Sequence, residues 1–588
     1  MRALFVSRES TWRPGLGAVL GILLLATVIA YAPVLVYGYP ANGWDSRYHA
    51  VTARLFSDQL WSGDLYPRWL MAMNSGLGSP HFFYYSPLGY YIASAFDWFG
   101  APTAIPQLGV AAVLLGLMSG LTCYLWLARL MPNYAAISGA VFYLASPFHV
   151  FLDLLTRADY AEFAAITFAP IVLLGIELLR ERKHVGIPLM SLGFAAVVLT
   201  HVVVGLLFAG VPLVYAVARF RFLPGWLRNT FLVFLAIVIG LGIASFYLSP
   251  ALAYRPDVVM PVRQMAAEMF VFGGPAQPRL ILFVRLLFVG YLAVLVVMAG
   301  AWWHTYRGRP DGNLVMTCLC LALLTLGLTT IWARPLWLML PILWTLQFSY
   351  RLFIIVDLCM AALVGWFISA MASRLPAARI VSLALFAILA TAASAAAFAL
   401  RFGVFEYDSQ LWRERVRYTN DYGLFRPLAV RTALPADRLP LYGGGVFGPD
   451  IPLPPRTRLM EGDASVLILD WRPRRIVLQI EAQTPGRLAV GQLYVPGWQA
   501  TDLSSGRTLP VLPSPGEGLL TIPFDAGLHR LAVLLIPRPP EREGAAISLL
   551  SMTLLVALTV GFGFAHADFP RGLWPQRWLG VWSRWKSP

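Results

Sequence analysis

Two polar islands of this chain, each set between long apolar runs, contain residue types that can move protons or bind anions. The first covers residues 43–91 and opens with GWDSRYH, shortly after the apolar run at residues 15–37. Asp45 would lie there beside a bilayer and among aromatic side chains. Partial desolvation of this kind raises the pKa of a carboxyl group and makes it a better proton acceptor. We therefore consider Asp45 as a general base; the simpler interpretation is a helix N-cap before Ser46.

His49 and Arg68 of the same island are candidates for binding an anion. His49 follows Asp45 by one helical turn and would hydrogen-bond that carboxylate or a phosphate, or serve as an ordinary interfacial histidine. Arg68, in the segment GDLYPRW, offers a guanidinium group that binds phosphate with two parallel hydrogen bonds, or that extends to the lipid headgroups. The sequence leaves both alternatives open for each residue.

The second island, LTRADYAEF, contains two carboxylates three residues apart, Asp159 and Glu162. If a helix begins there, both lie on one face, where they would hold an ion, bind sugar hydroxyls, or stabilise the positive N-terminus of that helix. No DxD pair accompanies them in the outer loops of the sequence. We therefore expect no metal or other cofactor; a divalent ion at Asp45, Asp159 and Glu162 is the less favoured alternative.

Two further ionisable residues stand between apolar stretches, His201 in LTH and Arg351 in LQFSYR. Ionisable groups at such depth are costly, and they usually face a cavity or a partner. Arg351, with Gln347 and Tyr350 beside it, is a candidate ligand for a lipid phosphate, or else a headgroup anchor at a helix end.

Membrane helices must position these residues. Of the 588 residues, 58% are hydrophobic and 13% are charged, a composition outside the range of soluble domains. We therefore predict a polytopic α-helical membrane protein. The net charge of +15 is spread over loops beside apolar runs and forms no contiguous block, which argues against a nucleic-acid partner. All four cysteines lie within apolar runs, so the sequence supports neither a disulfide framework nor a metal knuckle.

The apolar runs predict about twelve spans of ~20 residues, several of them shorter. Residues 186–218 are interpreted as two short helices that meet near His201. Residues 1–401 then form a transmembrane domain with a first outer loop at 38–104. Nearly all of the cationic charge is arginine, with lysine only at Lys183 and Lys586, which is typical of a GC-rich bacterial genome. We therefore expect a multi-pass protein of the bacterial inner membrane, and by the positive-inside rule both termini are expected in the cytoplasm. The residues that indicate this are Arg2, Arg8 and Arg13 at the start and Arg571, Arg577, Arg584 and Lys586 at the end.

Residues 402–543 have a different pattern. Period-two runs such as RRIVLQIEA and RLAVGQLYV are bounded by PG, SSG, SPG and DAG turns. This pattern predicts an antiparallel, sandwich-like β domain outside the cytoplasm, in the periplasm. Residues 544–588 then contain a last transmembrane helix, from Ala546 to Phe564, and a basic cytoplasmic tail.

Several motifs occur in an order and spacing that resembles a known family. They are GWDSRYH, GDLYPRW, NSGLGSPHFFYYSPLGYY, RADYAEF, LTH and LQFSYR, followed in the β domain by LYVPGWQATDLSSGRTLPV and GLLTIPFDAGLHRLAVLLI. The series is similar to bacterial membrane proteins of GT-C type, the 6-pyruvoyl-tetrahydropterin-synthase-related proteins and their YfhO-like relatives. The chain departs from the expected pattern where Ser349, Tyr350 and Arg351 stand in place of Pro-Trp-Arg.

The resemblance implies a GT-C fold and a glycosyltransferase, a hexosyl- or pentosyltransferase, that inverts the sugar. The donor would be a polyprenyl-phosphate-linked sugar, and the acceptor an envelope glycan, lipid or protein on the outer face. Asp45 matches the family's general base. Asp159 and Glu162 match acidic residues that help to hold the acceptor or the base. The donor-phosphate positions are matched by Arg351, His201 and Arg68.

Other functions remain as alternatives. A polysaccharide polymerase, a ligase or a flippase is also polytopic with outer loops, although a flippase needs polar groups along the bilayer midplane. A non-catalytic envelope-assembly protein with a glycan-binding β domain is a further alternative. The sugar, the acceptor, the oligomeric state and any protein partner are not specified by the sequence.

Overall fold

The structure is a computed structural model that describes residues 15–99, 103–183, 185–259, 267–274, 278–305, 307, 312–372, 376–401, 403–405, 426–428 and 455–566. The basic terminal residues that predict cytoplasmic ends lie outside these ranges. So does most of the first part of the predicted outer domain, residues 406–425 and 429–454.

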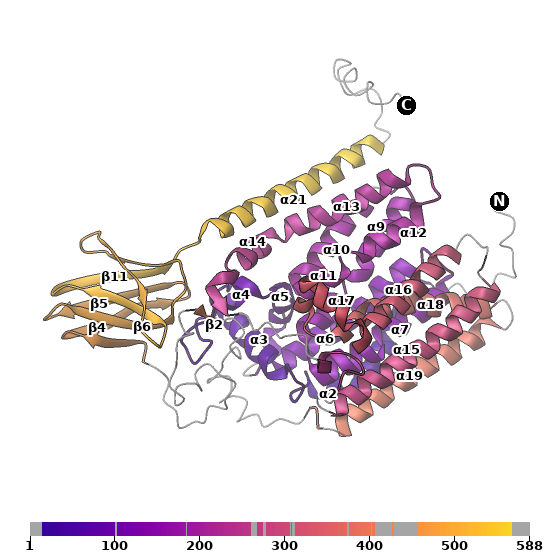
Figure 1. Ribbon diagram of the computed structural model, residues 1–588, viewed down its shortest axis with the longest axis horizontal. Coiled ribbons are helices and arrows are strands. Elements are labelled where there is room, and N and C mark those ends of the chain that lie inside the picture. Colours follow the sequence, from indigo (N-terminus) through magenta and orange to yellow (C-terminus); the bar gives the residue numbers. More distant parts are fainter. Residues whose placement is uncertain are drawn as a thin grey trace, which may run out of the picture.

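A bundle of apolar helices forms the larger part of the molecule (Figure 1). Among the described residues, nine helical segments are long and apolar enough to cross a bilayer, and three further apolar helices are shorter. Together they match the predicted spans one for one, so the polytopic helical fold is confirmed. In chain order they are α1 (Leu16–Ala30), α6 (Ile105–Leu127), α7 with η2 (Asn133–Leu144, Pro147–Arg157), α8 with α9 (Tyr160–Ile166, Ala169–Arg180), α10 (Gly186–Thr200), α11 with α12 (Val202–Phe208, Val211–Phe220), α13 (Trp226–Ile243), α15 (Pro278–Thr305), α16 (Gly312–Leu328), α18 (Phe353–Met371), α19 (Ala377–Arg401) and α21 (Pro539–His566).

The break predicted at His201 is present. α10 ends at Thr200 and α11 begins at Val202, and His201 between them is extended, with φ −155° and ψ 106°. The His201 ring caps the N-terminus of α11, because its Nδ1 accepts a hydrogen bond from the Val204 N–H at 3.3 Å. The two short helices therefore meet at an ionisable side chain.

Short helices fold the chain between α1 and α6. They are α2 (Ala32–Tyr37), α3 (Ser46–Trp61), α4 (His81–Tyr84), α5 (Leu88–Ser94) and η1 (Asp97–Phe99). The most buried of them are α3 and α4. Aromatic pairs join these helices: the Phe56 ring of α3 lies 4.7 Å from the Phe82 ring of α4, and the Phe82 ring lies 5.0 Å from the Tyr90 ring of α5, both edge to face. Most of α3 is thus packed under other elements, whereas Asp58 and Trp61 near its C-terminus are exposed.

The chain between α13 and α18 adds shorter elements outside the spans. They are α14 (Ser245–Ala253), η3 (Arg255–Asp257), β1 (Val258–Val259), η4 (Ala267–Met269), η5 (Ile331–Ala333), α17 (Arg334–Met339), η6 (Pro341–Leu346) and η7 (Ser349–Leu352). β1 pairs with β2 (Arg426–Pro427). η7 continues directly into α18, so Arg351 stands at the beginning of a long buried helix.

The predicted antiparallel β domain is confirmed and projects from one end of the bundle (Figure 1). One sheet has the order β3-β6-β10-β9 and the other the order β4-β5-β11-β7-β8. Their bounds are β3 Thr457–Glu461, β4 Ala464–Arg472, β5 Arg475–Ala482, β6 Gly486–Leu493, β7 Trp498–Asp502, β8 Thr508–Leu509, β9 Leu512–Pro513, β10 Leu519–Phe524 and β11 Gly527–Leu535. The last helix, α21, begins at Pro539, before the predicted boundary at residue 544.

The β domain is docked on the first outer segment. The Trp69 indole N–H donates to Gln492 Oε1 at 2.7 Å, and the Gln492 amide donates in turn to the Gly76 carbonyl at 2.7 Å. Leu493 N–H donates to the Leu77 carbonyl, also at 2.7 Å. Trp69 and Trp498 meet edge to face with ring centroids 5.6 Å apart. Side chains of the outer segment therefore complete the hydrophobic core of the β domain.

Gly78 allows this close approach, and we expect Gly78→Ala to disturb it. Its φ is +85°, and an added Cβ would lie 2.6 Å from the Trp69 ring and 2.7 Å from Gln492 Oε1. The backbone strain alone costs roughly 1–2 kcal/mol. Gly76→Ala is the matched control, because Gly76 has φ +90° but open space around the added Cβ. In thermal unfolding of the full-length protein, Gly78→Ala should lower the Tm more than Gly76→Ala; equal shifts would contradict the docking.

Candidate active site

Four segments that are distant in sequence meet at the ends of the spans. They are the start of α3, the turn between η2 and α8, the α10–α11 break, and η7. The first two are joined by the backbone, because the Asp45 N–H donates to the Arg157 carbonyl at 2.7 Å. Gly43 permits this contact, since a Cβ there would lie 2.5 Å from the Cβ of Ala158. The two polar islands of the sequence are therefore one site.

Two buried arginines bridge three buried carboxylates at the centre. Arg157 donates from Nη1 to Asp153 at 2.7 Å and from Nη2 to Asp159 Oδ2 at 2.8 Å, and its Nη1 lies 3.1 Å from Glu162 Oε2. Arg351 places Nη2 3.2 Å from the same Asp159 oxygen and Nε 2.6 Å from the same Glu162 oxygen. None of the five side chains is more than 5% exposed. Paired charges of this kind tolerate burial, whereas single ones do not.

Asp159 lies between two spans, and its surroundings stabilise the ionised form of its carboxyl group. It caps α8, because its Oδ1 accepts the Glu162 N–H at 3.1 Å. The same oxygen lies 3.4 Å from His49 Nε2, whose other ring nitrogen shares a 2.8 Å hydrogen bond with the Tyr90 hydroxyl. Burial alone would raise the pKa of Asp159, but Arg157 and His49 together lower it well below its usual value. Asp159 is therefore held as an anion.

Asp45 has the opposite character. It is partly buried at the N-terminus of α3, but its side chain makes no capping hydrogen bond. Burial and the negative charge of Asp159 raise the pKa of Asp45, against the opposing effects of Arg157, His49 and Arg351. A carboxylate with a raised pKa that is not engaged in capping a helix is suited to accept a proton. The simpler N-cap interpretation is not supported by this geometry.

Gln347, Tyr350 and His201 lie around the two arginines. Arg351 Nη1 donates to Gln347 Oε1 and to the Leu346 carbonyl, each at 3.1 Å. The Tyr350 ring lies 5.7 Å from the Arg157 guanidinium carbon, and its buried hydroxyl finds no hydrogen-bond partner among the described residues. That hydroxyl is free to meet a polar group of a ligand.

Arg68 lies elsewhere. Its Nη2 donates to the Phe246 carbonyl at 2.9 Å, its Nη1 lies 3.7 Å from Glu541 at the start of α21, and its guanidinium stacks over the Tyr66 ring. Glu541 also accepts a 3.0 Å hydrogen bond from Arg474 of the β domain. Arg68 therefore joins the outer segment, the last helix and the β domain, and the structure does not bring it together with the other predicted site residues.

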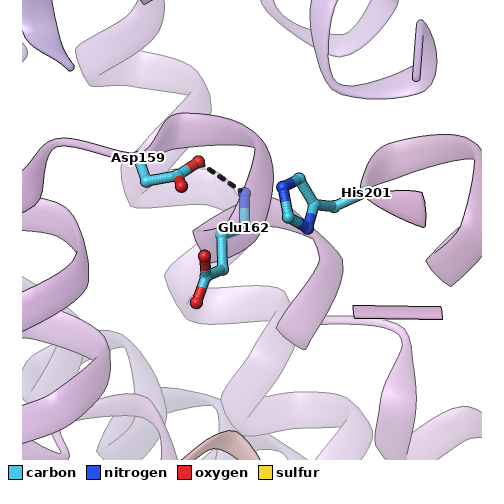
Figure 2. Close-up of side chains that lie close together, drawn as sticks. All are labelled: Asp159, Glu162 and His201. Atoms are coloured by element: carbon cyan, nitrogen blue, oxygen red, sulfur yellow. Dashed lines mark hydrogen bonds between the residues drawn. The ribbon is translucent and has the colours of Figure 1, made fainter. Parts of the chain in front are cut away.

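A metal ion would have few free ligands in the described part of the site. Figure 2 shows Asp159, Glu162 and His201 close together, and one ligand atom from each lies within 4.8 Å of the others. However, Asp159 Oδ2 and Glu162 Oε2 already pair with both arginines, and Asp159 Oδ1 faces His49. Glu162 Oε1 and one nitrogen of His201 remain, so an ion there would have to complete its coordination with water or with the oxygens of a ligand. The other carboxylate oxygens of this group are engaged by the two arginines and His49.

Arg157 and Asp153 complete the site but were not among the candidates from the sequence. They are four residues apart in an apolar run, LDLLTR, which places them on one helix face. An acid and a base at that spacing within a span indicate a buried pair. This signal was present in the sequence and could have identified both.

Fold and site together define a polytopic helical membrane protein that collects buried arginines and carboxylates at the ends of its spans, beside a docked β domain. The chain belongs to the family described as "6-pyruvoyl-tetrahydropterin synthase related domain; membrane protein", which matches residues 82–402. The predicted resemblance is thereby confirmed. The match includes Asp159, Glu162, His201 and Arg351, whereas Asp45 precedes it.

Several solved membrane glycosyltransferases are similar to this chain at low identity. The arabinofuranosyltransferase AftD from Mycobacteria is 17% identical with a TM-score of 0.41, over 66% of this chain and 27% of AftD. The apo oligosaccharyltransferase of Archaeoglobus fulgidus is 14% identical with a TM-score of 0.42, over 74% of this chain and 60% of that one. The arabinosyltransferase EmbB of Mycobacterium smegmatis is 15% identical with a TM-score of 0.32, over 91% of this chain and 65% of EmbB. No curated protein matches the chain in sequence.

Proposed function

We propose that this protein is a membrane glycosyltransferase of GT-C type that transfers a sugar from a polyprenyl-phosphate donor to an acceptor hydroxyl of an envelope glycan, lipid or protein. One observation carries the proposal: a carboxyl group with a raised pKa, Asp45, stands beside two buried arginines where helix ends meet. A sugar phosphate needs this combination, because one group must accept a proton while others stabilise a departing phosphate.

In the proposed reaction Asp45 takes the proton of the acceptor hydroxyl. The acceptor oxygen then forms a bond to the anomeric carbon, and the bond from that carbon to the phosphate oxygen breaks. The electron pair leaves with the polyprenyl phosphate, whose negative charge Arg351 and Arg157 stabilise. Because one carboxylate acts as base and no covalent intermediate forms, the configuration of the sugar is inverted.

The arginines are engaged by carboxylates before a donor arrives. Asp159 Oδ2 and Glu162 Oε2 each lie within hydrogen-bonding or ion-pair distance of both guanidinium groups. A phosphate presents two oxygens to a guanidinium in the same bidentate way as a carboxylate does. We infer that the donor phosphate takes the place of one carboxylate oxygen on Arg351, and that His201 and the free Tyr350 hydroxyl lie close enough to assist.

We place the site on the outer face of a bacterial inner membrane, with cytoplasmic termini and a periplasmic β domain, because the basic residues of the sequence collect at the opposite helix ends. In this orientation the acceptor would approach from the side of the β domain. Lipid-linked donors would enter from the bilayer.

The test compares a strain that lacks the protein with its parent by mass spectrometry of envelope glycans and lipid-linked sugars. We expect one sugar to be missing from a glycan, lipid or protein of the envelope and a polyprenyl-phosphate sugar to accumulate. The wild-type protein should restore both. Identical glycan and lipid-linked sugar profiles in the two strains would refute the proposed function.

The raised pKa of Asp45 gives a prediction for the pH dependence of transfer. A general base acts only when ionised, so turnover should fall as the pH drops through the raised pKa, at a higher pH than for an ordinary aspartate. Stability changes in the opposite direction: a carboxyl whose pKa is raised in the folded state stabilises the protein as it protonates. Turnover measured alongside thermal unfolding should therefore show an acid limb without loss of folded protein. Asp45→Glu should shift that limb; an unshifted limb would mean that another group titrates.

A further inference from the structure

A second buried polar cluster lies among the spans and has no part in the chemistry proposed above. It consists of Asp357 of α18, His149 of η2, Ser146 just before η2, and Tyr291 of α15. Asp357 and Ser146 are 0% exposed, His149 is 1% exposed and Tyr291 is 4% exposed. An ionisable side chain inside a span is costly and usually has a function.

The hydrogen bonds of this cluster determine where its protons are. The Tyr143 carbonyl can only accept, so His149 Nδ1, at 2.8 Å, must carry a hydrogen. Ser146 Oγ accepts from the His149 N–H at 3.1 Å and donates to Asp357 Oδ2, and the Tyr291 hydroxyl donates to Asp357 Oδ1. His149 Nε2 then faces Asp357 Oδ2 at 3.4 Å.

Two lone pairs would face each other across that gap if His149 were neutral and Asp357 ionised. A bare carboxylate in hydrocarbon is strongly unfavourable, and so is a buried nitrogen lone pair without a donor. One additional proton between the two atoms removes both problems, whether it resides on the imidazole or on the carboxyl. The cluster is then a neutral, proton-sharing pair.

The pair joins the two elements that deliver the site arginines. Asp357 follows Arg351 by six residues in the continuous run of η7 and α18, about 9 Å along a helix at 1.5 Å per residue. His149 precedes Arg157 by eight residues on η2. Arg351 and Arg157 meet at Glu162 Oε2, so a shift of η2 against α18 would pull one guanidinium away from the other.

We propose that His149 and Asp357 are positioning residues that share one proton and so hold η2 against α18, which sets the spacing of Arg157 and Arg351 for the donor phosphate. The proposal rests on the proposed function for its kinetic readout. A displacement of about 1 Å at a distant support can cost on the order of 10²-fold in rate, so the effect should be measurable.

The decisive variants are Asp357→Leu and Asp357→Asn. Leucine removes every hydrogen bond of the pair, whereas the asparagine amide can still donate to His149 Nε2 and its carbonyl can still accept from Tyr291. We expect Asp357→Leu to raise the donor KM by about 10-fold or more with the acceptor KM unchanged, and Asp357→Asn to remain within about threefold of wild type. A purely structural role would reduce the amount of active protein and leave both KM values unchanged.

Tyr291→Phe is the matched control. It removes a hydrogen bond to the same carboxylate, but from α15, a helix that carries none of the site residues described. It should lower the Tm and leave the donor KM within about twofold of wild type. His149→Leu, which also removes every hydrogen bond of the pair, serves as a second test if Asp357→Leu does not fold, with the same donor-selective effect expected.

Binding of polyprenyl monophosphate to the full-length protein in detergent micelles separates this proposal from the proposed function. If wild type transfers no sugar but Asp357→Leu binds polyprenyl monophosphate about 10-fold more weakly than wild type, the positioning role stands and the enzymatic function fails. If Asp357→Leu and wild type bind it equally, or if Asp357→Asn is as impaired as Asp357→Leu, the positioning role is refuted.

Discussion

Asp45→Asn should leave the protein folded and in the membrane but lower sugar transfer by about 10²- to 10⁴-fold, the usual contribution of a general base. Asparagine keeps the shape of the side chain and loses the proton acceptor. Its cost to the fold should be small, because the Asp45 side chain caps no helix. Removal of a carboxylate whose pKa burial raises also relieves an unfavourable buried charge. The variant should therefore unfold no earlier than wild type.

Initial rates with the purified protein at saturating donor and acceptor measure this effect. Asp58→Asn is the control, because Asp58 lies on the same helix, pairs with Arg54 and has a side chain that is 53% exposed. It should transfer sugar at the wild-type rate. Turnover by Asp45→Asn within a few-fold of wild type would remove Asp45 from the chemistry, even if sugar transfer itself had been demonstrated.

Arg351→Lys should be the second large loss, about 10²- to 10³-fold in turnover, in the range observed when one group that stabilises a developing anion is removed. Arg351 spreads its donors over Asp159, Glu162, Gln347 and the Leu346 carbonyl. An ammonium group is a single point charge without the planar fork, so lysine cannot serve these partners and a phosphate at once. The variant should therefore have a higher KM for the donor and a lower kcat.

Arg219→Lys controls for the general cost of changing a partly buried arginine that is paired with a carboxylate. Arg219 binds Glu177 through Nε and Nη2, each at 2.6 Å, and its side chain is 12% exposed. This variant should lose stability but keep the wild-type turnover per folded molecule. If Arg351→Lys and Arg219→Lys behave alike once corrected for the amount of folded protein, Arg351 has only a structural role.

The helical fold could be predicted because each span is determined by a continuous stretch of the sequence. Runs of about 20 apolar residues are required to cross hydrocarbon, and alternation with a period of two is characteristic of strands. The same logic found the break at His201, where a polar residue interrupts an apolar run. β4, the sequence ASVLILDWR, alternates in the same way.

The site was predictable only in part, because its residues are assembled by contacts that local sequence does not encode. Asp159 and Glu162 were found from their spacing, but the arginines that neutralise them come from η2 and η7. Arg68 has a side chain that can bind an anion, yet its guanidinium group is already paired with Glu541 and the Phe246 carbonyl. Asp357 and His149 were overlooked although each is an ionisable residue inside an apolar run, which was sufficient signal.

The docking of the β domain has a consequence for folding during synthesis of the chain. Trp69 and its partner Gln492 are 423 positions apart. At about 5–20 residues per second, the ribosome needs about 20–85 s to make the second after the first. Throughout that interval the segment that contains Trp69 has been made, but the surface of the β domain that it will contact has not. A nascent chain that stalls before residue 492 would therefore leave an inserted bundle whose first outer segment stays unfinished.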